Sequence, residues 1–459
     1  MSSTPLSAGR EGSLEAPKRH PIDWRNPDFY NEEALQKELE RVFDICHGCR
    51  RCFSLCESFP ALFDAIDETA DGELHGVDRK VYWEVVDHCY LCDMCFMTKC
   101  PYVPPHPWNL DFPHLMLRAK AVHSKTEGAS LRNNLLASTE LVGRLAGIPV
   151  VAEVINAVNR IPAARVLLEK VGGVHRDAPL PEFHSTSART RLMPLAGALP
   201  TAAAVAVPAS RDQIQGRVAL FTTCYGNRNE PDLALDLAAV FEHNDIPVRL
   251  VRKERCCGMP RLELGDLETV AKYKEENIPE LLKVIAAGYD VVAPIPSCVL
   301  MFKQELPLMF PDDPDVALVA SRIYDPFEYL MLRHKAGLLK IEFKNELGKV
   351  SYHVPCHLRV QNIGLKTRDV LKLVPGTTVD VIERCSGHDG TYAVKTEFRP
   401  HSVKIGRPVA TRVQNAHPEH YASDCPMAGH QIESLLPADG HGPTEPEHPL
   451  KLLRQAYGI

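Results

Sequence analysis

The sequence predicts a multidomain protein of the α and α/β classes, in which a helical N-terminal module precedes a duplicated α/β domain. Its 459 residues exceed what one ordinary hydrophobic core organises. Eight of its 15 cysteines crowd into two blocks between residues 46 and 100, and a predicted helix leads into the second block. The other seven recur in two later segments that share one alternation of strands and helices.

Composition and charge exclude several classes of protein. The net charge of −7 gives no reason to expect binding to nucleic acid. No run of the sequence approaches the roughly eighteen apolar residues of a membrane span, and the N-terminus has no apolar signal stretch. We therefore expect a cytoplasmic protein whose reduced cysteines bind metal rather than form disulfides. Residues 1–25 are expected to form a disordered tail.

The two N-terminal cysteine blocks follow one spacing. Each contains Cys-x2-Cys-x2-Cys and a trailing cysteine, and in two-cluster ferredoxins the trailing cysteine binds the cluster of the other block. The alternative is a pair of zinc sites. Zinc sites of this kind combine two pairs of ligands, and three evenly spaced cysteines followed by a fourth do not fit that pattern well. The predicted ligands are Cys46, Cys49, Cys52 and Cys100 for one 4Fe–4S cluster, and Cys89, Cys92, Cys95 and Cys56 for a second.

The region around these blocks is predicted to be a helical ferredoxin-like module over residues 26–130. The blocks lie 32 residues apart, and a helix is expected at 78–88, so the compact bacterial ferredoxin type is disfavoured. Glu57 follows Cys56 where proline is usual, which alters the turn but keeps every ligand.

Residues 111–175 are predicted to form short helices separated at Pro149 and Pro162. Arg118 to Lys170 contains eight Lys/Arg and four Glu, which is a basic balance within an acidic protein. A basic amphipathic segment can lie on an anionic membrane surface, and the alternative is an ordinary packing layer between domains. Residues 173–215 are expected to be a linker, with a flexible stretch at 198–208.

The remaining cysteines mark an internal repeat. Strands are predicted at 217–223, 247–251 and 289–294, and again at 349–355, 378–384 and 421–424, and a cysteine stands at or just after the end of each. Corresponding cysteines are 132, 129 and 127 residues apart. Carboxyl ends of parallel strands are where such sheets place their sites. The two predicted sites are Cys224, Cys256, Cys257 and Cys298, and Cys356, Cys385 and Cys425.

Two ferredoxin-type blocks followed by two Cys-Cys-Gly domains resemble the iron–sulfur subunit of anaerobic glycerol-3-phosphate dehydrogenase. They also resemble the glycolate oxidase iron–sulfur subunit and fused heterodisulfide reductase subunits. The resemblance covers about residues 40–435 and rests on the cysteines above, with Gly258 and His357. It implies an electron-transfer subunit that passes electrons from a partner flavoprotein dehydrogenase toward quinone or another acceptor. In heterodisulfide reductases these domains hold non-cubane clusters that reduce a disulfide.

The chain departs from the full Cys-Cys-Gly motif. Met301 and Ala428 stand where each domain would carry a final cysteine, and Ser386 replaces the paired cysteine of the second domain. The four cysteines of the first domain suffice for a third cubane cluster. The second domain is expected to hold a cluster completed by His357, Ser386 or His388, to bind zinc, or to have kept its cysteines for packing alone.

The sequence therefore predicts an electron-transfer subunit, cytoplasmic or peripheral at the inner face of the membrane. The alternatives are a thiol, heterodisulfide or quinone reductase that uses the first Cys-Cys-Gly site, and a metal-stabilised scaffold. No nucleotide-binding motif is present, so a partner would carry the flavin. The expected domains are 26–130 (ferredoxin-like), 131–215 (helical segment and linker), 216–345 (first Cys-Cys-Gly domain), 346–440 (second, degenerate domain) and 441–459 (C-terminal tail).

Overall fold

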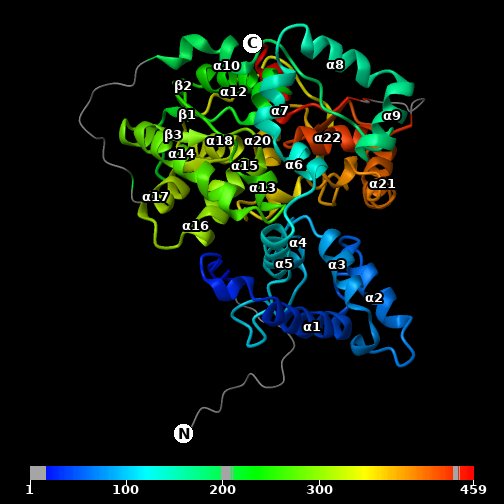
Figure 1. The fold of residues 1–459 in the computed structure, drawn as a ribbon. Coiled ribbons are helices and arrows are strands. Elements are labelled where there is room, and N and C mark those ends of the chain that lie inside the picture. Colours follow the sequence, from blue (N-terminus) through cyan, green and yellow to red (C-terminus); the bar gives the residue numbers. More distant parts are fainter. Residues whose placement is uncertain (1–16, 198–207, 209, 438–442, 444) are drawn as a thin grey trace. The chain divides into compact units, whose positions relative to one another are not determined.

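The computed structural model describes residues 17–197, 208, 210–437, 443 and 445–459 (Figure 1). The chain divides into two compact units. The first comprises the chain up to Gly128 together with Glu263–Leu267, and the second comprises Ala129–Leu262 and Glu268–Ile459.

The described part of the first unit is helical, without a strand. The helix predicted at 78–88 is confirmed, since Asp78 caps a helix by accepting a hydrogen bond from the Lys80 amide. Aromatic side chains fill the core, where the rings of Phe59 and Phe112 lie 4.8 Å apart. The elements are η1 (Pro27–Tyr30), α1 (Glu32–Cys49), α2 (Ser58–Asp67), η2 (Leu74–Gly76), α3 (Arg79–Asp87), α4 (Met94–Thr98) and α5 (Phe112–Thr126).

The predicted disordered tail at 1–25 is wrong for its described part, which begins at residue 17. Ile22 and Trp24 are buried. The Arg19 guanidinium donates hydrogen bonds to the carboxylates of Asp93, at 2.6 Å, and Asp111, at 2.9 Å. Bidentate ion pairs of this kind hold the segment in place, and they join residues too distant in sequence for local patterns to reveal.

The second unit begins with a layer of short helices: α6 (Leu131–Ala137), α7 (Thr139–Ala146), α8 (Val151–Asn159) and α9 (Pro162–Gly172). The predicted breaks are confirmed, because α7 ends before Pro149 and α9 starts with Pro162 in its first turn. The predicted linker contains α10 (Ala188–Arg191) and η3 (Met193–Ala196). Its flexible stretch at 198–208 lies outside the described residues except for residue 208.

Two parallel sheets follow, and their matching order confirms the duplicated α/β fold. The first sheet has the order β2-β1-β3-β4 and the second has the order β6-β5-β7, so the repeat-equivalent strands occupy equivalent places. The strands are β1 (Val218–Leu220), β2 (Val248–Leu250), β3 (Asp290–Val292), β4 (Ile323–Tyr324), β5 (Lys349–His353), β6 (Thr378–Ile382) and β7 (His420–Ser423). Strand β4 was not predicted, and it extends only the first sheet.

Helices flank the first sheet (Figure 1), and others contact the strands of the second. Those of the first repeat are α11 (Cys224–Arg228), α12 (Pro231–His243), α13 (Met259–Leu262), α14 (Leu267–Ala286), α15 (Pro296–Leu300), η4 (Met301–Glu305), α16 (Leu306–Met309), α17 (Pro314–Arg322) and α18 (Pro326–Lys335). Those of the second are α19 (Cys356–Arg359), α20 (Lys366–Leu371), η5 (Tyr392–Val394), α21 (Arg399–Ala416) and α22 (Pro426–Glu433). The element η4 is a single turn of π-helix that continues from α15, and such turns are frequent near functional sites.

The C-terminal tail expected at 441–459 instead ends in helix α23 (Pro449–Tyr457), which packs against α12. Leu450, Leu453 and Tyr457 are buried at helical spacing, and the Tyr457 hydroxyl donates to the Lys340 carbonyl at 2.7 Å. The apolar stripe of this helix explains why the segment packs instead of extending into solvent.

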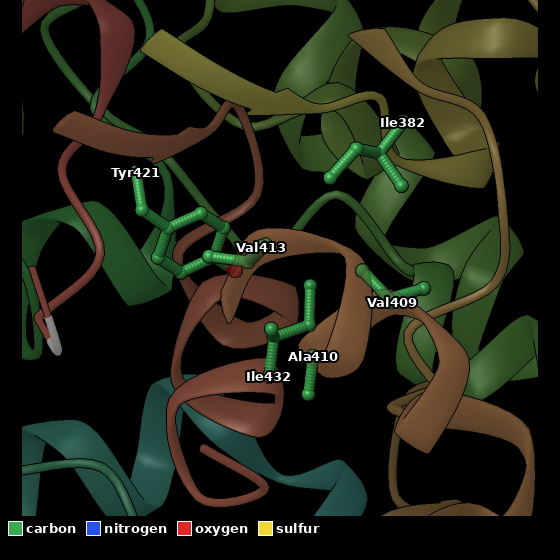
Figure 2. Close-up of a cluster of buried hydrophobic side chains, with 6 residues drawn as sticks. All are labelled: Ile382, Val409, Ala410, Val413, Tyr421 and Ile432. Atoms are coloured by element: carbon green, nitrogen blue, oxygen red, sulfur yellow. The ribbon is translucent and has the colours of Figure 1, made fainter. Parts of the chain in front are cut away.

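The second repeat has its own apolar core, in which strands β6 and β7 pack against α21 and α22 (Figure 2). Tyr421 and Ile432 are fully buried there. Such packing holds the ends of β6 and β7, and with them the loops that carry cysteines. The cluster consists of Ile382, Val409, Ala410, Val413, Tyr421 and Ile432.

Candidate metal centres

The first predicted cysteine set surrounds the end of α1. Cys46 and Cys49 lie in its last turn, and Arg50 then adopts a left-handed conformation with φ of 52° that turns the chain toward Cys52. Burial raises the pKa of the Cys46 thiol well above its usual value, and repulsion from Cys100, Cys52 and Cys49 adds to the rise. The structure thus brings the four thiols within electrostatic range of one another.

The second set lies around a tightly curled loop. Leu91 and Asp93 have φ of 54° and 61°, so the backbone folds back on both sides of Cys92. Burial raises the pKa of the Cys95 thiol well above its usual value, with further repulsion from Cys52, Cys89 and Cys56. The trailing Cys56 of the first block therefore lies near the second block, as the ferredoxin pattern requires.

The two N-terminal sets differ in their exposure to solvent. Cys89 and Cys95 of the second set are buried, whereas its Cys56 and Cys92 are partly exposed, as are all four cysteines of the first set. Phe53, beside Cys52, is 54% exposed, while Phe96 is buried beside Cys95. The first set therefore lies closer to the surface of its unit than the second.

The four cysteines of the first repeat meet at the carboxyl ends of β1, β2 and β3. Cys224 opens α11 directly after β1, the Cys256-Cys257 pair follows β2, and Cys298 lies in α15 after β3. Hydrogen bonds from the Cys224 and Cys257 thiols hold the pKa of Cys256 well below its usual value. Cys257 in turn interacts with Cys298, so the sulfurs form one connected group. We call this group the four-cysteine site.

Met301, which stands in place of a final motif cysteine, is fully buried on the π-helix η4. Its methyl group lies next to Gly258, since a Cβ atom at Gly258 would be only 3.6 Å from that methyl carbon. Gly258 itself has φ of 103°, a conformation that disfavours other residues. Apolar packing therefore fills the position of the missing thiolate.

The three cysteines of the second repeat follow β5, β6 and β7 in the same way, and Asp389 joins them. The Cys385 thiol donates to the Asp389 carboxylate at 3.5 Å and accepts from the Gly387 amide at 3.3 Å. Burial raises the pKa of Asp389, although the hydrogen bond from Cys385 opposes the rise. Asp389 is not among the predicted ligands, although an acidic residue four positions after Cys385 is visible in the sequence.

The three side chains predicted as possible extra ligands of the second repeat, Ser386, His357 and His388, have different hydrogen-bond partners. Ser386 accepts a hydrogen bond from the His388 amide at 3.3 Å, and His357 Nδ1 lies 2.8 Å from the Ser297 hydroxyl of the first repeat. Burial lowers the pKa of His388 to about 4, and its Nε2 has no hydrogen-bond partner among the residues that the structure describes. Among the described residues, no three His, Cys, Asp or Glu side chains converge as they would around a single ion.

The two repeats face each other at their cysteine ends. Burial raises the pKa of Cys425 to about 11, and repulsion from Cys298 of the other repeat contributes. The Gln361 amide donates to the Pro296 carbonyl at 3.3 Å, close to the Ser297–His357 contact. The two sets of cysteines therefore lie on neighbouring surfaces of one unit.

The donor chemistry of these sets suits iron–sulfur clusters. Burial raises the pKa of Cys52 to about 12 and that of Cys100 to about 11, and repulsion from neighbouring thiolates adds to both rises. Bound iron compensates the charge of coordinating thiolates and keeps them deprotonated.

Comparison with known proteins agrees with this arrangement. A model of the cysteine-rich domain, CCG, matches residues 218–303 and 350–433. The chain is 27% identical over 352 residues to a subunit of the anaerobic glycerol-3-phosphate dehydrogenase of Escherichia coli (strain K12), covering 76% of this chain and 83% of that protein. It is 26% identical over 246 residues to a subunit of the fumarate reductase (CoM/CoB) of Methanothermobacter marburgensis, covering 52% and 46%. An uncharacterized iron–sulfur protein of Methanocaldococcus jannaschii is 26% identical over 232 residues, covering 50% and 43%.

Proposed function

Because the chain belongs to the family of iron–sulfur proteins that includes this subunit of anaerobic glycerol-3-phosphate dehydrogenase, we propose that it is an electron-transfer subunit of an oxidoreductase complex. In this proposal it passes electrons between a partner flavoprotein dehydrogenase and quinone or another acceptor. Its similarity to subunits of a dehydrogenase and a reductase supports a redox partner.

The observation that carries the proposal is the grouping of thiols in both units. We assign one 4Fe–4S cluster to Cys46, Cys49, Cys52 and Cys100 and a second to Cys89, Cys92, Cys95 and Cys56. We assign a third to the four-cysteine site. When bound, these clusters take up and release single electrons, and the chain sets their potentials through burial and hydrogen bonds to sulfur. The second repeat, with Cys356, Cys385 and Cys425, is proposed to hold a further cluster or to serve packing.

The packing of Met301 argues against a disulfide reductase at the first repeat. Non-cubane clusters that reduce disulfides use five cysteines in the related motif, whereas here a buried methionine occupies the fifth position. Four thiolates match an electron-passing cubane.

A redox titration followed by electron paramagnetic resonance tests the proposal on anaerobically purified full-length protein. We expect signals of reduced clusters with separate midpoint potentials, since the two N-terminal sets differ in burial. Protein that contains iron and sulfide but shows no reducible paramagnetic species would contradict electron transfer and favour a structural scaffold.

We further propose that the helical layer α6–α9 contacts an anionic membrane surface, which would make the protein peripheral at the inner face of the membrane. No single described helix meets the length and hydropathy of a span, and α7 with α8 does so only as a pair bent by 107°. Large apolar side chains are nevertheless exposed along this layer, among them Leu131, Leu135, Leu141, Leu145, Ile148, Val150, Val154, Val158, Ile161, Leu167 and Val171. The exposed Arg144 and Lys170 would meet anionic headgroups.

Flotation with vesicles that contain anionic phospholipid tests this contact. The wild-type protein is expected to float with the vesicles, and the double variant Leu141→Glu/Leu145→Glu is expected to lose most of that binding, since each charge opposes apolar burial. Leu338→Glu is a control, because Leu338 is 55% exposed, close to the 47% of Leu141 and the 54% of Leu145, but lies outside the layer. Wild-type protein that stays in the soluble fraction would contradict membrane contact.

A further inference from the structure

Helix α7 starts at the four-cysteine site, although it lies outside the matched domain. Thr139 is its first residue, and the Thr139 hydroxyl oxygen lies 3.2 Å from the Cys224 sulfur and 3.8 Å from the Cys256 sulfur. Both separations suit a hydrogen bond to sulfur. A side chain from the helical layer therefore reaches two of the four thiols.

Neighbouring contacts hold Thr139 in this position. The Glu140 carboxylate accepts hydrogen bonds from the Cys256 amide at 3.0 Å and from the Arg255 guanidinium at 2.9 Å. On the preceding turn, Arg261 donates to the Ser138 hydroxyl at 2.7 Å. The turn between α6 and α7 is thus attached on both sides of the Cys256-Cys257 pair, so the contact of Thr139 with sulfur is part of an ordered network.

A hydroxyl donor near ligating sulfur affects the two redox states unequally. An added electron increases the negative charge on the cluster and its sulfurs, so a hydrogen bond to sulfur stabilises the reduced state more and raises the reduction potential. The Gly258 amide also donates to Cys256, but a side-chain substitution cannot remove that donor. Thr139 can lose its donor by an isosteric change, which isolates its effect.

We propose that Thr139 is a positioning residue that raises the reduction potential of the cluster at the four-cysteine site, by donating a hydrogen bond from α7 to the nearer sulfur, that of Cys224, with the sulfur of Cys256 also within reach. The inference rests on the proposed function, because it requires a cluster at these cysteines. Helix α7 also carries the exposed Leu141 and Leu145. The tuned cluster would then lie beneath the face proposed to meet the membrane, where a lipid-soluble acceptor would receive electrons.

The test is a redox titration of full-length Thr139→Val, Thr139→Ser and wild-type protein, each with its iron content measured. We expect Thr139→Val to lower one midpoint potential and leave the others unchanged. Thr139→Ser keeps the hydroxyl and should retain the wild-type value. Thr126→Val is a matched control and should leave every potential unchanged, since the Thr126 hydroxyl donates to the Val122 and His123 carbonyls of its own helix.

The outcomes separate this inference from the proposed function. If every midpoint potential of the Thr139→Val protein equals the wild-type value at unchanged iron content, the inference is overturned. The proposed electron transfer would still stand. Wild-type protein without a reducible cluster would overturn the proposed function itself. If Thr139→Val loses iron, Thr139→Ala is titrated in its place, and a potential equal to that of Thr139→Ser would overturn the inference.

Discussion

Replacing Cys257 with serine is expected to remove about four iron atoms per chain, because a cubane at the four-cysteine site would lose one of its thiolates. The Cys257 thiol is buried and interacts with both Cys256 and Cys298, so it lies inside the connected group of sulfurs. In anaerobically purified protein, the measured content of iron and of sulfide should each fall by about four atoms per chain. Electron paramagnetic resonance should show the loss of one signal.

Cys385→Ser is the matched control in the second repeat. Cys385 is the repeat equivalent of Cys256, but its neighbour is Ser386 and its thiol already pairs with Asp389. If the second repeat holds no cluster, this variant keeps all of the wild-type iron; a further loss of about four atoms would place a cluster there. Wild-type iron content in Cys257→Ser would contradict the assignment of a cluster to the four-cysteine site.

Replacing Arg322 with leucine is expected to lower the free energy of unfolding by about 3–5 kcal/mol, because it leaves a buried carboxylate without its cation. The side chains of Arg322 and Asp290 are 1% and 0% exposed. Asp290 also accepts hydrogen bonds from the Gln215 amide at 2.6 Å and the Tyr329 hydroxyl at 3.1 Å. These donors cannot neutralise its charge.

The pH dependence of this variant has a definite sign. Burial already raises the pKa of Asp290, while the Gln215 amide and Arg322 oppose the rise. Removing Arg322 raises that pKa further, and a carboxyl whose folded pKa is raised is destabilising above its ordinary pKa. The difference in the free energy of unfolding between the wild-type and Arg322→Leu proteins should therefore be largest near neutral pH. It should shrink as the pH falls and Asp290 is protonated.

Denaturant unfolding at several pH values measures both effects. Arg412→Leu is the matched control, because the Arg412–Asp380 pair is 52% and 33% exposed and should contribute only about 0–1 kcal/mol. A loss in Arg322→Leu no larger than that in Arg412→Leu would contradict the expected role of the buried pair.

Periodic and local features were predictable from the sequence. Three strands of each repeat and the breaks at Pro149 and Pro162 follow from hydrophobic patterns and proline geometry, which act over a few residues. The duplication was visible because cysteines recur at nearly constant separation along the chain. Local spacing also grouped the cysteines into candidate sets.

Contacts between distant segments were not predictable in this way. Arg19 meets Asp93 across 74 positions of sequence, and Thr139 meets Cys224 across 85. Asp389 was overlooked because the sequence places it beyond the motif, and its importance depends on the turn that directs it toward Cys385. Helix α23 was not predictable from the sequence, because a short amphipathic segment acquires most of its stability from the surface that it covers.

From sequence alone, the chain is a multidomain iron–sulfur candidate with a duplicated α/β domain whose second copy has lost cysteines. Residue identity and spacing are enough for these predictions, since the type of ligand and the hydrophobic periodicity can be read directly from the sequence. Tertiary structure decided which side chains complete each site: Met301 in place of a thiolate, Asp389 beside Cys385, and Thr139 over the four-cysteine site. These roles depend on distances between elements, which arise only when the sheets and helices pack together.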